Sequence, residues 1–185
     1  MKVYIKFLVV FAYFVATTCI VYDIEAQTKV YKIGGRGPGG GYIFYDKGSY
    51  SNGWRYLEAA PNDQGEAQWG CIEKSIPGAE GTSIGSGKSN TLAIERNCGE
   101  SSIAAKLCTT YNGGGKSDWF LPSKNEFDLM YRNFHKVGVG GFASDIYWSS
   151  SEINAKYAWS QYFYIGGQDY CLKNDYLRVR AIRAF

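Results

Sequence analysis

The sequence predicts an α+β fold in which two helical segments pack on antiparallel sheets, with the N- and C-terminal strands close together. Three observations lead to this prediction. Runs rich in aromatic and β-branched residues, separated by glycine turns, occupy residues 30–60. Helical periodicity appears in residues 89–135, and strand-like runs return in residues 147–185. Strands, then helices, then strands is an order typical of α+β domains.

The predicted strands are short and are bounded by turn residues. In the N-terminal part they comprise residues 30–33, 42–45 and 54–60, and Pro61 ends the last of them. A loop rich in Gly, Ser and charge follows, over residues 62–88. The C-terminal strands are predicted at residues 147–151, 158–165 and 177–185.

The helical region begins with a segment that a glycine divides. Ser89 or Asn90 can cap a helix that runs to residue 97, and Gly99 interrupts it. Ser101 or Ser102 can cap a second stretch. Its apolar residues recur at helical spacing, as Ile103, Leu107, Cys108 and Tyr111.

The clearest helix follows an extended segment, residues 118–122. Ser123 and Glu126 lie three residues apart, which is the spacing of a capping box. The helix they introduce is expected to end near His135, whose charge suits a helix C-terminus. One face of this helix carries Phe127, Met130, Tyr131 and Phe134.

The first 26 residues have the layout of a secretory signal peptide. Lys2 and Lys6 precede an apolar run over residues 7–22, and the segment ends in the small residue Ala26. Cleavage there leaves one domain, residues 27–185, and predicts export to the periplasm, the cell surface or the medium. Two alternatives stay open: an uncleaved anchor, and a lipoprotein modified at Cys19.

Composition limits the partners. The chain has 185 residues and a formal charge of only +3, which is too small an excess to predict a nucleic-acid partner. A membrane contact is expected only through the leader or a lipid anchor. The 16 Tyr, 10 Phe and 5 Trp residues provide many rings for contact surfaces.

Four cysteines follow the predicted leader, and an even number in an exported chain indicates two disulfides. Three pairings of them are possible. A zinc site is disfavoured, because the sequence has no CxxC motif and a single histidine. No metal or cofactor is therefore expected. The four residues are Cys71, Cys98, Cys108 and Cys171.

The sequence favours binding over catalysis. The glycines of residues 35–40 have the Gly-x-Gly-x-x-Gly spacing of a dinucleotide-binding motif. That motif opens a helix, whereas these residues lead into a predicted strand, so the match is not functional. Residues 81–89 resemble a phosphate loop but lack one of its glycines. His135 would have to act as the base of a hydrolase, but the sequence contains no Gly-x-Ser-x-Gly nucleophile elbow. An exported hydrolase with paired carboxylates remains the enzymatic alternative, with Glu152, Asp169 and Asp175 as its acids.

Several ordered motifs resemble a bacterial domain family typified by the C-terminal domain of Lcl, a collagen-like adhesin. The resemblance extends over residues 30–185. It implies a C-type-lectin-like fold, related in shape to formylglycine-generating enzymes and to variable receptor-binding domains. The motifs are residues 31–34, 37–40, 53–61, 118–123, 147–152, 158–159 and 178–183.

This resemblance implies attachment. We expect a surface-associated, adhesin-like module that recognises a glycan or an extracellular or host protein without catalysis. The calcium-dependent sugar motifs of animal lectins are absent from the sequence, so calcium-dependent binding is not expected. A structural envelope protein without a discrete ligand is the third alternative.

The resemblance also implies a pairing of the cysteines. Members of the family often carry the equivalents of Cys98 and Cys108 together, which leaves Cys71 to pair with Cys171. A straight helix from residue 98 to 108 would separate the two Cα atoms by roughly 15 Å, too far for a disulfide. The pairing therefore requires the chain to reverse near Gly99.

In the implied fold, the second half of the domain usually carries the ligand. Rings interleaved with hydroxyls, amides and acids suit a sugar or a peptide. Strand alternation points about half of these side chains inward, and Trp148 or Trp159 suits the core better than a contact. The candidates are Trp148, Ser150, Glu152, Trp159, Gln161, Tyr162, Tyr164, Gln168, Asp169 and Tyr170.

Arginines near the C-terminus form a second candidate site. Arg178 and Arg180 project to the same side of the predicted strand. Pairing with acids across the sheet is their favoured role. The alternative is a patch for an anionic ligand, helped by the fork geometry of guanidinium.

Overall fold

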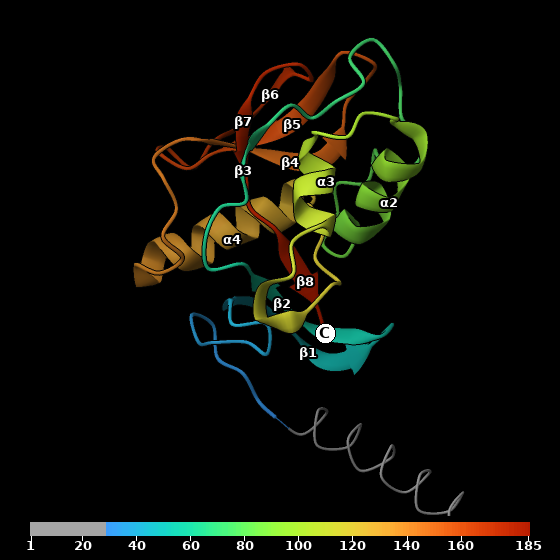
Figure 1. Cartoon of the computed structure of the whole chain (residues 1–185). Helices are drawn as coiled ribbons and strands as arrows, with labels where there is room; N and C mark the ends of the chain where they lie inside the picture. The colour runs from blue at the N-terminus through green and yellow to red at the C-terminus, as the bar shows by residue number, and fades with distance from the viewer. Residues whose placement is uncertain (1–28) are drawn as a thin grey trace, which may run out of the picture. The chain divides into compact units, whose positions relative to one another are not determined.

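The computed structural model describes residues 29–185, without the side chains of residues 135–137 (Figure 1). The predicted leader with its cleavage site, and Cys19, lie outside the described residues, as does the side chain of His135. Residues Tyr31–Phe185 form one compact unit. No helix in the described part of the chain is long and apolar enough to cross a membrane.

The unit is α+β, as the sequence predicted, and it has two sheets and three α-helices (Figure 1). The first sheet is antiparallel and has the order β1-β2-β8. Its strand β8 pairs with β2, so strands from the two ends of the unit share a sheet, also as predicted. The three strands are β1 (Tyr42–Ser51), β2 (Trp54–Ala59) and β8 (Ile182–Ala184).

The second sheet has five strands in the order β3-β7-β4-β5-β6. Its neighbours are antiparallel except for β4 and β7, which run parallel. The prediction of purely antiparallel sheets is wrong at this pair, because the chain crosses from the β6 edge to insert β7 between β3 and β4. The strands are β3 (Gly65–Ala67), β4 (Ile146–Glu152), β5 (Tyr157–Tyr162), β6 (Gln168–Leu172) and β7 (Leu177–Val179).

Two predicted strands differ from the structure. Residues 30–33 form no strand and lead into a turn. In this turn the Gly34 N–H donates to the Ile43 carbonyl oxygen, and the Ile43 N–H donates to the Gly35 carbonyl oxygen. The predicted strand at 177–185 is divided into β7 and β8, which belong to different sheets. Arg180 and Ala181 connect the sheets at this point, so the alternation of side chains is not continuous from Arg178 onward.

The first helical segment is divided near Gly99, as predicted, into the helices α2 (Gly87–Asn97) and α3 (Ala104–Thr109). The short 3-10 helix η1 (Gly113–Gly115) precedes α4 (Lys124–Val137). The capping box of α4 is confirmed, because the Ser123 side chain accepts from the Glu126 N–H. The predicted caps at residues 89–90 and 101–102 are wrong, since Ser86 and Ile103 precede the two helices and neither supplies a side-chain cap.

Helix α4 lies between the two sheets and contacts β1, β4 and β5 (Figure 1). Its apolar face closes one core cluster together with Phe44, Leu57 and Tyr147. A second cluster fills the space between α2, α3 and the five-stranded sheet, and it contains Trp69 and Trp148. The domain is thus built around α4, with one core cluster involving each sheet.

The glycine-rich loop before β1 wraps a buried carboxylate. Glu58 accepts hydrogen bonds from the N–H groups of Gly39 (3.0 Å) and Gly41 (2.7 Å), and Arg183 pairs with it at 3.2 Å. A Cβ at Gly37 would stand 2.4 Å from the Glu58 carboxyl carbon. Arg183 also forms two hydrogen bonds with Asp118 (2.8 and 2.9 Å). Motifs far apart in the sequence therefore meet in one buried network, which gives them a structural role.

Candidate functional site

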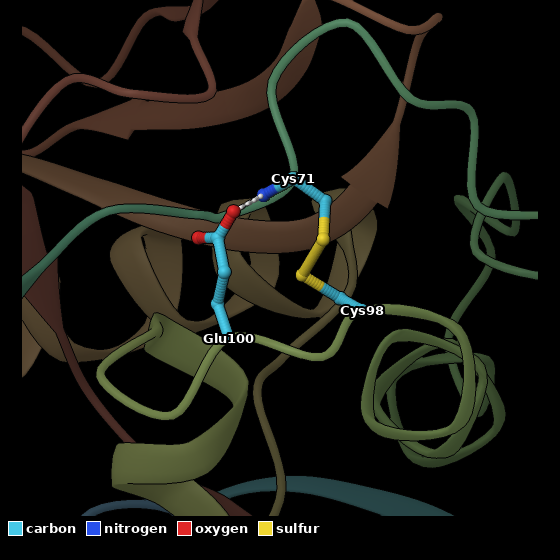
Figure 2. Close-up of side chains that lie close together, drawn as sticks. All are labelled: Cys71, Cys98 and Glu100. Carbon is cyan, nitrogen blue, oxygen red and sulfur yellow. Dashed lines mark hydrogen bonds between the residues drawn. A yellow bond between two sulfur atoms is a disulfide. The ribbon is translucent and has the colours of Figure 1, made fainter.

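The disulfide arrangement differs from the predicted pairing. Cys71 bonds to Cys98, with Cα atoms 5.8 Å apart (Figure 2). Cys108 and Cys171 are free thiols, so one disulfide replaces the two that were predicted among these four cysteines. Cys98 leaves the end of α2 in an extended conformation and meets the loop that holds Cys71. The chain does turn back after α2, since Lys106 of α3 pairs with Glu95 of α2 at 2.8 Å. Cys98 nevertheless bonds to Cys71, and Cys108 lies inside α3 with its side chain in the core.

Cys71, Cys98 and Glu100 are the one cluster of potential metal ligands in residues 29–185. Both sulfurs are already bonded to each other, and a disulfide lacks the thiolate that binds metal strongly. Glu100 accepts a hydrogen bond from the Cys71 N–H at 3.0 Å (Figure 2). The cluster ties the loop at residue 71 to the segment that joins α2 and α3.

Four of the predicted ligand residues belong to the core, so they are not available to a ligand. Strand β4 lies inside the sheet between β7 and β5, and every residue after Ile146 in it is buried. Trp148 donates from Nε1 to the carbonyl oxygen of Ala67 at 2.9 Å. The four residues are Trp148, Ser150, Glu152 and Gln161.

Glu152 forms a fully buried ion pair with Lys173. Its carboxylate also accepts from the Ile76 N–H at 2.9 Å. The Lys173 ammonium lies 4.5 Å from the Trp69 ring and donates to the Lys74 carbonyl oxygen at 2.9 Å. Burial lowers the pKa of Lys173, against the opposing effect of the hydrogen bond that its ammonium donates to Glu152. This pair anchors the ends of β4 and β6 to the loop between β3 and α2.

The other predicted acids are also engaged in local structure. Asp175 accepts from the Leu172 N–H at 3.0 Å, just after β6. Asp169 is exposed and accepts from the N–H of Tyr170 at 2.8 Å. Glu152 points inward to Lys173, away from solvent. Each of the three carboxylates therefore has a structural partner of its own.

The predicted arginine patch is occupied by acids. Buried Arg180 pairs with Asp63 at 2.6 Å and donates to the carbonyl oxygens of Ala60 and Gly140. Arg178 pairs with Asp145 at 2.7 Å and with Asp63 at 3.4 Å. The hydrogen bond from Arg178 holds the pKa of Asp145 below its usual value. These contacts correspond to the pairing role that the sequence favoured for the two arginines.

The remaining candidates lie on β5, on β6 and in the turn between them. Trp159 pairs with Tyr170 across the two strands, so both side chains point to the same side of the sheet. The rings of Tyr157 and Tyr170 are 5.1 Å apart in an edge-to-face arrangement. Tyr170 is 53% exposed, and Trp159 and Tyr157 are half-buried. Three rings on neighbouring strands thus reach solvent on one side.

Helix α4 contributes a cation to this side. Its first residue, Lys124, places Nζ 3.8 Å from the centre of the Trp159 ring. Gln168 donates from Nε2 to the Lys124 carbonyl oxygen at 2.7 Å, which connects the helix to the start of β6. Lys124 forms no ion pair with any acid of residues 29–185. We call this set the β5–β6 aromatic face: Lys124, Tyr157, Trp159, Gln168 and Tyr170.

Tyr162, Tyr164 and Asp169 do not join this set. Alternation along the strands turns Tyr162 and Asp169 to the side opposite Trp159 and Tyr170. There the Tyr162 hydroxyl lies 3.9 Å from the Cys171 sulfur, and burial together with this thiol raises the pKa of Tyr162 to about 12. Tyr164 stands in the exposed turn after β5. The ten candidates therefore divide among the core, two sides of the sheet and a turn.

Sequence reasoning missed Lys124 and Tyr157. Lys124 lies 35 residues before Trp159 in sequence, and only the packing of α4 on the sheet brings them together. Tyr157 is the first residue of β5 but lies one residue before the predicted strand at 158–165. The sequence therefore offered no reason to include it among the candidate ligand residues. Strand pairing with Leu172 and the ring contact with Tyr170 place it in the site.

No protein-family model matches the chain, and no curated protein sequence matches it significantly.

Proposed function

We propose that the protein is an exported, adhesin-like module that binds a glycan through the β5–β6 aromatic face and performs no catalysis. The observation that carries the proposal is the pairing of Trp159 and Tyr170 across neighbouring strands with both rings reaching solvent. Flat rings side by side cover the apolar C–H faces of a sugar, while nearby polar groups fix its orientation.

The polar groups beside the rings suit a sugar that carries an acidic substituent. The Lys124 ammonium lies over Trp159 and has no carboxylate partner in the described part of the chain. An acidic substituent would therefore meet a cation that its own protein leaves uncompensated. Gln168 can present its remaining amide oxygen as an acceptor for sugar hydroxyls, because its Nε2 is bonded to Lys124.

We further propose a C-type-lectin-like fold and a place outside the cytoplasm. Supporting the fold, β8 returns to pair with β2, and a separate sheet carries the aromatic face. Supporting export, the Cys71–Cys98 disulfide is of the kind that persists in oxidising compartments. An experimental structure would test the fold, and sequencing the N-terminus of the protein recovered from its host would test the leader.

The experiment that tests the function is a glycan array read with wild-type protein and three variants. Tyr170→Ala and Lys124→Gln remove groups of the β5–β6 aromatic face, and both should abolish or strongly reduce binding. Tyr50→Ala removes an equally exposed ring from the other sheet and should bind as wild type does.

Three outcomes would reject the proposal. One is the absence of binding to any glycan on the array. Another is a loss in Tyr50→Ala equal to that in Tyr170→Ala, which would show that the face has no special role. The third is release of a cleaved sugar on incubation, which would indicate a hydrolase. Selective binding to an extracellular protein through the same face would replace the glycan by a protein ligand.

A further inference from the structure

Helix α2 is bordered by two hollows that lie far in sequence from the β5–β6 aromatic face. The larger, of about 430 Å³, is lined by residues of the β1–β2 hairpin, of β8 and of the start of α2. The smaller, of about 190 Å³, lies toward α3 and residues 117–120. Lys88, Leu92 and Phe120 line both hollows. We call the two together the α2 groove.

The groove has polar and apolar lining, and its apolar side chains can contact a flat ring. Leu92 belongs to both hollows and is 40% exposed. Phe120 lies beneath and is almost fully buried. Trp54 forms another wall of the larger hollow. At Gly85, an added Cβ would stand 3.3 Å from the Trp54 ring, so the missing side chain keeps that wall accessible.

The groove carries an excess of positive charge that is not neutralised by its own acids. Its two acids already have partners: Glu95 pairs with Lys106 at 2.8 Å, and Asp118 pairs with Arg183 at 2.8 Å. Lys88 is exposed and forms no ion pair with any acid of residues 29–185. Burial raises the pKa of Asp118, but Arg183 and, to a smaller extent, the nearby Lys88 lower it below its usual value.

A second lysine lies against the Trp54 ring, outside the residues that line the groove. Lys47 lies 3.8 Å from the centre of the Trp54 ring and donates to the Ser51 carbonyl oxygen. Like Lys88, it forms no ion pair within the described residues. The groove therefore has an apolar floor, an indole wall and one lining cation without a carboxylate partner, Lys88, while Lys47 adds positive charge beside the indole. This arrangement is complementary to an apolar anion.

We propose that the α2 groove binds a small aromatic carboxylate, with its ring system between Trp54 and Leu92 and its carboxylate on Lys88. The larger hollow falls within the range of about 300–1,000 Å³ that is usual for small-molecule sites. The site shares no residue with the β5–β6 aromatic face, so it is independent of the glycan proposal.

The test is a titration of the isotope-labelled protein, followed by NMR, with 2-naphthoate as the probe. The neutral 2-naphthalenemethanol has the same ring system without the charge and serves as the matched ligand. We expect 2-naphthoate to give saturable shifts of the Trp54 indole N–H and the Leu92 methyl groups. The neutral alcohol should bind about tenfold more weakly, because one charge-assisted hydrogen bond is lost.

Three variants locate the site. Lys88→Gln should weaken 2-naphthoate about tenfold without changing the affinity for the alcohol. Leu92→Glu places a negative charge at an exposed helical position, so the fold should persist while 2-naphthoate binding is lost. Lys156→Gln removes an exposed lysine from the turn between β4 and β5 and should have no effect.

The proposal is overturned if 2-naphthoate gives no saturable shifts up to millimolar concentration, or shifts that lie away from the groove. It is also overturned if the alcohol binds as tightly as the carboxylate, or if Lys156→Gln weakens binding as much as Lys88→Gln does. Loss of glycan binding with intact 2-naphthoate binding would bear on the aromatic face alone.

Discussion

The N–H of Gly85 donates to the Glu126 carboxylate over 2.8 Å, which links the start of one helix to the first turn of another. Glu126 also accepts from the Ser123 N–H at 2.7 Å, as a capping box requires. One buried carboxylate therefore satisfies backbone donors in front of both α2 and α4. This explains why Ser86, the residue that precedes α2, needs no side-chain cap.

Glu126 should make the stability of the protein depend on pH. Burial raises its pKa from 4.5 to about 7, against the opposing effect of hydrogen bonds from Ser123, Gly85 and Gly87. The folded protein therefore binds this proton more tightly than the unfolded chain does. The contribution is fully present below the unfolded pKa and is lost as the pH rises through 7. We expect a loss of about 2–3 kcal/mol from this group between pH 5 and pH 8.

Urea unfolding of the wild type and Glu126→Gln at both pH values checks this prediction. Glutamine keeps an oxygen acceptor for the backbone donors but has no proton to lose. The pH-dependent fall in unfolding free energy should be smaller in the variant by about 2–3 kcal/mol. An equal fall in both proteins would show that Glu126 does not titrate in this range.

The disulfide can be checked by the reactivity of the remaining thiols. A thiol reagent should label half-buried Cys171 in the native protein and should label Cys108 only after unfolding, because Cys108 is fully buried in α3. Peptide mapping should recover Cys71 linked to Cys98. Replacing both of these by Ser should lower the unfolding free energy by about 2–4 kcal/mol. A recovered Cys98–Cys108 peptide would contradict the structure.

The tight approach of the glycine-rich loop to β2 gives a steric prediction. A Cβ at Gly41 would stand 2.0 Å from the carbonyl oxygen of Ala59, a backbone atom that cannot move aside alone. Gly41→Ala should therefore cost several kcal/mol of stability, roughly 3 or more, as severe overpacking does. At Gly99 an added Cβ meets nothing within 4 Å and the backbone needs no positive φ. Gly99→Ala should accordingly leave the thermal midpoint nearly unchanged.

Local chemistry was readable from the sequence, whereas long-range packing was not. The Ser123–Glu126 capping box and the stripe of Phe127, Met130 and Phe134 are confirmed, because both depend on residues three or four apart. The burial of every residue of β4 after Ile146 depends on β7 entering the sheet beside β4, which strand alternation cannot reveal.

The same limit explains the errors in the candidate site. The choice of disulfide partner depends on where α2 ends and on the position of a loop 27 residues earlier in the chain, and neither follows from spacing. Lys124 joins Trp159 only through the packing of α4. By contrast, the pairing of arginines with acids could be anticipated, since a buried guanidinium such as that of Arg180 requires a partner.

The buried pair of Lys173 and Glu152 gives the last prediction. Both side chains are almost completely removed from solvent, so each neutralises a charge that the interior would otherwise hold alone. Lys173→Met leaves the Glu152 carboxylate without its cation, and Glu152→Gln leaves the Lys173 ammonium without its anion. Each single change should lower the unfolding free energy by about 3–5 kcal/mol. The double variant removes both charges, so it should be more stable than the sum of the two losses implies. Urea unfolding of the four proteins measures this coupling, and strictly additive losses would mean that the two groups do not depend on each other.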